Sequence, residues 1–190
     1  TWRLSPGPNE GRATSDGQLE PQTFVDETWS LHEAAVVERQ DGVLLLFMRN
    51  QHPHGRVAVS ESHDAGQTWG AICFDENLPE IWCQPNAICL PSAEGEDRIV
   101  FANASLMLPF RGCGVIRLSL DGGRTWKRSR TFNPGHYVYQ CMCVLPDGRI
   151  GLLWENECQG LYFSRLPLSW FDAGIEAIEP HTTADQDGRL

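Results

Sequence analysis

The sequence SHDAGQTW at Ser62–Trp69 recurs as SLDGGRTW at Ser119–Trp126, 57 residues later. Both copies fit the pattern S-x-D-x-G-x-T-W, and each follows a stretch of alternating apolar residues, Val57–Ser60 or Val115–Leu118. Such alternation is typical of β-strands, and Asp and Gly favour the turn between two of them. The Asp carboxylate can accept bonds from the turn's N–H groups, and Gly supplies a positive φ. The repeat therefore predicts a β-hairpin turn whose Trp enters the core between sheets.

A second pattern consists of two short apolar strands around a polar turn that usually ends in Asp-Gly. Its three copies are Ala34–Glu38 with Val43–Met48, Asn86–Leu90 with Arg98–Ala102, and Cys141–Leu145 with Arg149–Trp154. Joined to the first pattern, they predict antiparallel units of four strands that start near residues 33, 85 and 139. Repeated units of this length indicate an all-β fold, a β-propeller, which hides its sheet edges by radial repetition.

Composition and charge exclude several classes of function. A chain of 190 residues with 41% hydrophobic residues fits one domain with a real core. Its 25 acidic and 15 basic residues give a net charge of −10, the opposite of the basic surface that nucleic acids or anionic membranes attract. The apolar run Val43–Met48 is far shorter than the roughly 18 to 20 residues of a membrane span, so we expect no transmembrane segment. No targeting segment is visible, and the compartment stays unknown.

The cysteines and histidines give no sign of a metal site. Seven Cys is an odd number without a C-x-x-C pair, and Cys141 and Cys143 alternate as inward-facing residues of a strand would. We expect buried free thiols, with disulfides as the alternative for an exported protein. The six His show no ligand spacing.

The S-x-D-x-G-x-T-W element resembles the Asp box of sialidases, and the resemblance extends over most of Leu31–Phe171. Glu33, followed sixteen residues later by Arg49, resembles the family's catalytic Glu and a substrate-binding Arg. Arg111 takes the place of the third arginine of the family's triad, and Tyr139 takes that of the catalytic tyrosine. The turn Cys83-Gln84-Pro85 resembles the one that opens the next blade.

The resemblance also implies a domain organisation. A sialidase-like propeller has six blades, of which this chain would carry about three. The implied division is a degenerate or truncated blade at 1–31, blades at 32–77, 78–133 and 134–175, and a tail at 176–190. We find no counterpart of the family's first arginine or of its Asp general acid, so an N-terminal half of the propeller would be missing. Because acid–base help is worth about 10² to 10⁴ in rate, we expect weak or no turnover by this chain alone.

Strand order gives a check that is independent of the family. In an up-and-down blade, the start of the first strand, the end of the second and the start of the third lie on one rim. Glu33 and Tyr139 begin first strands, Arg49 ends a second strand and Arg111 precedes a third. All four are therefore expected on one rim, with both Asp boxes on the opposite one.

The implied function is that of an exo-α-sialidase of the retaining type, which releases terminal sialic acid, or of an enzyme for another acidic sugar. Planar arginines bind a carboxylate through paired N–H bonds, a role implied for Arg49 and Arg111. The substrate's own charge would repel a carboxylate nucleophile, so a neutral phenol, Tyr139, attacks instead. A phenol needs a base within reach, which Glu33 would supply. No metal or organic cofactor is implied.

Alternatives remain open at each position. Tyr137 competes with Tyr139, Glu38 competes with Glu33, and the two arginines could be surface cations paired with carboxylates. The alternative function is a non-catalytic Asp-box propeller that binds glycans or proteins. A related hydrolase or lyase acting on another acidic sugar would use the same arginines.

Overall fold

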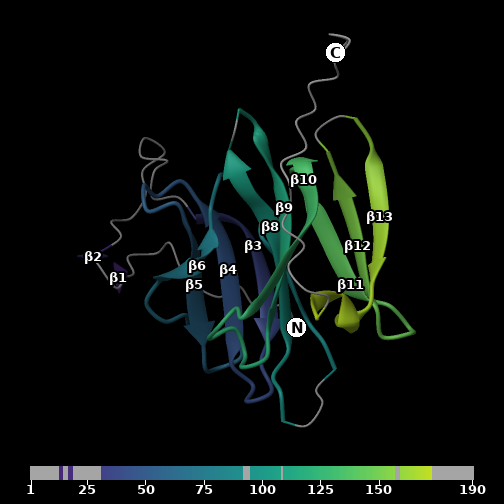
Figure 1. Cartoon of the computed structure of the whole chain (residues 1–190). Helices are drawn as coiled ribbons and strands as arrows, with labels where there is room; N and C mark the ends of the chain where they lie inside the picture. Colours follow the sequence, from purple (N-terminus) through teal and green to yellow (C-terminus); the bar gives the residue numbers. More distant parts are fainter. Residues whose placement is uncertain are drawn as a thin grey trace, which may run out of the picture.

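The computed structural model describes residues 13–14, 17–18, 31–91, 95–107, 109–156 and 159–172. They form three antiparallel sheets and one short pair, β1 (Ala13–Thr14) with β2 (Gly17–Gln18). The sheets stand side by side in chain order, from the blue strands to the yellow-green ones in Figure 1. The all-β class expected from the repeats is confirmed. Within the described residues, no helix is both long enough and apolar enough to cross a membrane.

Each sheet runs up and down without crossovers. The first contains β3 (Leu31–Glu38), β4 (Leu44–Asn50), β5 (Arg56–Ser62) and β6 (Cys73–Pro79). The second contains β7 (Asn86–Cys89), β8 (Ile99–Met107), β9 (Arg111–Ser119) and β10 (Arg128–His136). The third contains β11 (Gln140–Val144), β12 (Ile150–Glu155) and β13 (Leu161–Leu166), followed by the 3₁₀ turn η2 (Leu168–Phe171).

The described part of the third sheet has three strands, one fewer than the expected unit of four. The expected blade at 1–31 lies almost entirely outside the described residues, and the tail at 176–190 lies wholly outside them. The limits proposed for the other blades stay predictions.

The core lies between the sheets, and β8 shows why. Ile99 and Phe101 pack against the first sheet, whereas Val100 and Ala102 pack against the third. Successive side chains of a strand point to opposite faces, so a strand covered on both sides is apolar at every position. The first strands of the sheets, β3, β7 and β11, contact one another in turn.

Three aromatic rings join the first two sheets. Phe47 and Phe101 lie with ring centroids 5.3 Å apart, and Trp126 lies 6.1 and 5.6 Å from them. The indole N–H of Trp126 donates to Asp75 Oδ2 at 2.8 Å. The second Asp box therefore sends its Trp into the core, as expected. Both box tryptophans are half-buried, and Trp126 is the one that packs against the core between the sheets.

The Asp boxes are turns closed by their own side chains. In the second box, Ser119 Oγ and the N–H of Thr125 both donate to Asp121 Oδ1 at 2.8 Å, and Thr125 Oγ1 donates to Oδ2 at 2.6 Å. Gly123, at φ 82°, donates its N–H to Ser119 Oγ. The first box repeats this arrangement, and the bonds from Thr68 lower the pKa of Asp64 to about 2. These turns are therefore closed by ionised carboxylates at neutral pH.

We expect Asp121→Ala to lower the free energy of unfolding by about 1–2 kcal/mol at pH 7, because several hydrogen bonds are lost. Hydrogen bonds outweigh burial and lower the pKa of Asp121 in the fold. A carboxyl group whose pKa is lowered by folding stabilises the fold at pH values above its ordinary pKa. This contribution is lost as the pH falls through the pKa that the group has in the folded state. The loss measured by urea unfolding should therefore shrink at pH 3. Glu76→Ala, at an exposed site, is the control; equal losses in both variants would contradict the prediction.

The expected burial of the cysteines is wrong at three positions. Cys73, Cys141 and Cys143 are exposed, and the six cysteines within the described residues are free. In β11 it is Met142 that packs inward, because the second sheet covers only that face. Cys141 lies on the other face, where its cross-strand partner Leu153 is also exposed. The alternating pattern was real, but the sequence did not tell which face another sheet covers.

Candidate functional site

The four residues singled out in the sequence meet at one end of the sheets, although they come from separate strands. Arg49 is the next-to-last residue of β4, Arg111 is the first of β9, and Tyr139 directly precedes β11. Glu33 lies near the start of β3. Ser119, which opens the second Asp box, is the last residue of β9. The boxes and the four residues therefore occupy opposite strand ends, as the strand order predicts.

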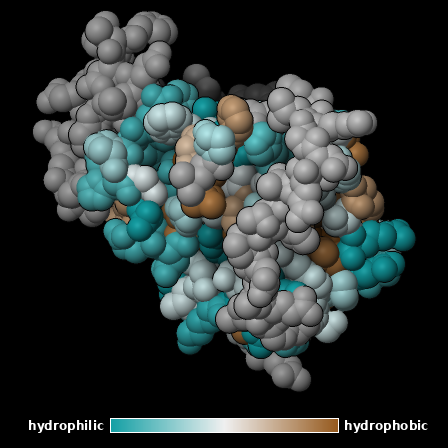
Figure 2. Space-filling model, turned by 45° about the horizontal axis from the view of Figure 1, so that its top comes forward, coloured by the Kyte–Doolittle hydropathy of each residue, from teal (hydrophilic) through white to brown (hydrophobic). Residues whose placement is uncertain are grey.

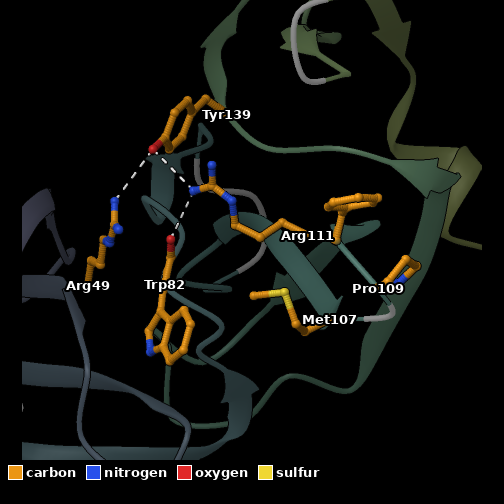
Figure 3. Close-up of a pocket in the computed structure, with 7 residues that line it drawn as sticks. Arg49, Trp82, Met107, Pro109, Arg111 and Tyr139 are labelled. Carbon is orange, nitrogen blue, oxygen red and sulfur yellow. Dashed lines mark hydrogen bonds between the residues drawn. The ribbon is translucent and has the colours of Figure 1, made fainter.

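The hydroxyl of Tyr139 lies between the two arginines (Figure 3). Arg49 Nη1 donates to it at 3.5 Å and Arg111 Nη1 at 3.2 Å. The Arg111 guanidinium also lies 5.2 Å from the centre of the Tyr139 ring, within cation–π range. Two cations thus direct N–H groups at one phenol oxygen.

Glu33 reaches the group through Arg49. Arg49 Nη1 donates to Glu33 Oε2 at 2.7 Å, so the carboxylate and the phenol share one nitrogen. Burial opposes the charge of Arg49, but its bonds to Glu33 and Tyr139 prevail and raise the guanidinium pKa. Arg49 therefore stays charged at neutral pH.

A β-bulge aims Glu33 at this point. Leu31 pairs with Asn50 and Ala34 pairs with Met48, so two residues of β3 face the single residue Arg49 of β4. A bulge of this kind re-aims a side chain. Glu38, the competing carboxylate, pairs with Leu44 at the other end of the strand.

A cavity of about 360 Å³ opens beside the two arginines and is large enough for a small ligand. Its lining residues are Arg49, Trp82, Met107, Pro109, Phe110, Arg111 and Tyr139. One side is thus cationic and the other is apolar, and Trp82 and Phe110 are more than half exposed. The apolar side was not predicted from the sequence. The Cys-Gln-Pro turn, which Trp82 directly precedes, was a signal for it.

Trp82 also supports the cationic side through its backbone. It has a φ of 64°, which is uncommon for a large side chain. Its carbonyl oxygen accepts a bond from Arg111 Nη1 at 3.1 Å. The strained turn therefore holds the guanidinium that contacts Tyr139.

Tyr137, the competing tyrosine, is fully buried and does not line the cavity. Its hydroxyl donates to Gln140 Oε1, and Gln140 Nε2 donates to the carbonyls of Gln84 and Ala102 at 2.9 and 3.0 Å. This network joins the second and third sheets through Tyr137 and Gln140, which precede and follow Tyr139 in the chain. Tyr137 thus helps to hold the sheets together, whereas Tyr139 is the tyrosine that faces the cavity.

On the surface, the side of the molecule in Figure 2 carries mostly hydrophilic side chains, with small hydrophobic patches between them. No cluster of three or more His, Cys, Asp or Glu side chains that could hold a metal ion occurs in the part of the chain that the structure describes. The donors around the cavity are guanidinium and phenol groups, which suit an anionic ligand.

Residues 10–152 match the model of a family described as the BNR repeat-like domain. The chain belongs to this family. The match covers both Asp boxes, all four site residues and most of the three sheets.

Two relatives found by sequence are sialidases. The domain is 35% identical to a sialidase of Micromonospora viridifaciens over 160 residues, which are 82% of this chain and 24% of the relative. It is 29% identical to a sialidase of Bacteroides fragilis, over 87% of this chain and 36% of the relative. The BNR repeat-like domain is thus homologous to sialidases, and it spans about a quarter to a third of their length.

Solved structures agree. The intramolecular trans-sialidase of Ruminococcus gnavus matches with a TM-score of 0.64 and 23% identity, over 77% of this chain and 34% of that one, which shows the shared fold. A Hadza microbial sialidase matches with a TM-score of 0.58 and 28% identity, over 73% of this chain and 28% of that one. The three sheets of the BNR repeat-like domain are therefore part of a sialidase-type propeller.

Proposed function

We propose that this chain carries the carboxylate-binding and nucleophilic half of an exo-α-sialidase site that acts on sialylated glycans. One observation carries the proposal: the hydroxyl of Tyr139 faces the cavity between two arginines that can bind the substrate's carboxylate. The homology to sialidases over the same residues supports the substrate class.

Binding begins with the charge. Sialic acid carries a carboxylate on its anomeric carbon, and the planar Arg49 and Arg111 groups offer paired N–H donors to it. Bound there, the carboxylate places the anomeric carbon next to the Tyr139 oxygen. It also replaces Glu33 as a partner of Arg49, which leaves the Glu33 carboxylate available to the phenol.

The first chemical step exchanges two bonds at the anomeric carbon. The Tyr139 oxygen forms a bond to that carbon as the bond to the leaving oxygen breaks, and the phenolic proton passes to Glu33. The leaving oxygen takes a proton from a general acid. In the second step, water attacks the anomeric carbon from the side that the leaving group vacated, opposite Tyr139, and passes its proton to the base that the general acid has become. The bond to the Tyr139 oxygen breaks, Glu33 returns the proton to the phenol, and the two inversions together retain the configuration.

We assign no general acid within the described residues. Acid help to the leaving group is worth about 10² to 10⁴ in rate, so we expect glycosides with poor leaving groups to turn over slowly on this chain. A substrate whose leaving group needs no proton avoids this limit and tests the nucleophile directly.

The test is covalent trapping with a fluorinated sialosyl fluoride, followed by mass spectrometry of the intact and digested chain. Fluoride leaves without protonation, so the Tyr139–sugar bond is expected to form even without an acid. The adduct should map to Tyr139 and vanish in Tyr139→Phe, while Tyr162→Phe, at an exposed tyrosine of β13, keeps it. Saturable binding of an unsaturated sialic-acid analogue with no adduct would instead favour the non-catalytic glycan-binding propeller.

A further inference from the structure

Glu80 is a buried carboxyl group near Arg49 of the candidate site, and the mechanism above gives it no role. It follows β6, is only 5% exposed and does not line the cavity. Its backbone N–H donates to the carbonyl of Gly55 at 2.9 Å, which fixes its position against the loop after β4. A buried carboxyl group is costly unless its oxygens are well bonded.

The bonds of this carboxyl group go to backbone N–H groups. Glu80 Oε1 accepts the N–H of Cys83 at 2.8 Å. The N–H groups of Trp82 and Asn50 are also near enough to favour its ionised form and lower its pKa. Glu80 thus fixes the turn after β6 and lies next to the end of β4.

Each of these three partners lies next to a residue of the site. Asn50 follows Arg49 in the chain. The carbonyl of Trp82 accepts a bond from Arg111. Cys83 Sγ contacts the carbonyl of Val138, the residue before Tyr139. One carboxyl group therefore lies beside segments that lead to both arginines and to the tyrosine, and it is hydrogen-bonded to the segment that contacts Val138.

Charge connects Glu80 to the site as well. The groups that face it are the Arg49 guanidinium from β4, the Cys83 thiol, and the backbone N–H groups named above. Glu80 Oε2 and Arg49 Nε are both buried and have no hydrogen-bond partner within the described residues. Burial raises the pKa of Glu80 to about 7. The nearby backbone N–H groups and the charge of Arg49 lower this pKa, but they offset the effect of burial only in part. Its charge therefore changes in the neutral range.

We propose that Glu80 is a positioning residue that holds the turn next to Arg111 and Tyr139, and that its ionised form weakens anion binding in the cavity. The ligand class rests on the proposed function. The direction follows from Coulomb's law: an ionised Glu80 offsets part of the charge of Arg49, whereas a protonated one leaves the full positive potential to the ligand.

The test compares wild type with Glu80→Gln, which keeps the shape and an acceptor oxygen but carries no charge. Binding of the unsaturated sialic-acid analogue is measured by calorimetry between pH 5.5 and 8.5. We expect the wild-type affinity to fall about fivefold between pH 6 and 8, and the affinity of Glu80→Gln to stay near the acid value. Glu76→Gln removes an exposed charge of the same strand region and should keep the wild-type slope. The same slope in Glu80→Gln and wild type would overturn the proposal.

A second measurement needs no ligand. The ring resonances of Tyr139, followed by NMR over the same pH range, should shift with a midpoint near 7 in wild type, and this shift should be lost in Glu80→Gln. His136, which contacts Phe110 at the cavity wall, is present in both proteins, so their difference isolates Glu80. If the analogue does not bind at all, the proposed function fails, and the NMR comparison still decides the role of Glu80. If the ring resonances of Tyr139 shifted with pH in the same way in both proteins, that role would be overturned.

Discussion

Replacing Arg111 with Ala is expected to weaken binding of the unsaturated sialic-acid analogue about 100-fold or more. The change removes a charged donor to the ligand's carboxylate, and each such bond contributes about 1.5–3 kcal/mol. It also removes the cation that contacts the Tyr139 hydroxyl and ring. The affinity of Arg111→Lys should lie between those of wild type and Arg111→Ala, because an ammonium keeps the charge but cannot donate in a planar pair. Calorimetry at pH 6 measures the effect.

Arg124→Ala is the control for this change. Arg124 lies in the second Asp box, at the opposite strand ends from the cavity, and its side chain is more than half exposed. Its loss removes the same net charge without touching the site. If Arg124→Ala weakened binding as much as Arg111→Ala, overall charge and not the paired arginines would explain the affinity.

Replacing Phe101 with Ala is expected to lower the free energy of unfolding by about 3–5 kcal/mol, the usual cost of deleting a buried aromatic ring. Phe101 is fully buried and contacts both Phe47 and Trp126, so its loss opens a cavity where the first two sheets meet. Domains are stable by only about 5–15 kcal/mol, so the variant should unfold at a much lower urea concentration.

Phe163→Ala provides the comparison, because Phe163 lies on the outer face of β13 and is more than half exposed. Its removal should cost less than about 1 kcal/mol. Similar losses in the two variants would show that the contact between the first and second sheets is not the main source of stability.

The two predictions separate stability from binding. Phe101 lies in the core that fixes one sheet against the next, and Arg111 stands at the end of a strand of the second sheet. The site requires residues from all three sheets. Arg49 lies in the first sheet, Arg111 lies in the second, and Tyr139 directly precedes the first strand of the third. A loss of sheet packing is therefore expected to disrupt the site even without any change at the rim.

The local features could be predicted from the sequence because their causes are local. Alternating apolar residues predict strands, and the Ser, Asp, Gly and Thr of each box close a turn over a few residues. When such strands are connected up and down, their order determines on which rim each strand end lies. This is why Arg49, Arg111 and Tyr139 could be expected to meet. Their chemical roles came from the resemblance to sialidases and stay proposals.

Features that depend on distant contacts could only be learned from the tertiary structure. Whether Cys141 or Met142 faces the core depends on which face of β11 the second sheet covers. The bulge at Glu33 and the left-handed backbone of Trp82 arise from the pairing of β3 with β4 and from the turn after β6. The burial of Glu80 depends on segments that pack over it from elsewhere in the chain. Sequence alone thus determined the repeat, the strands and the rim, whereas burial and bonding between segments decided how the site is built.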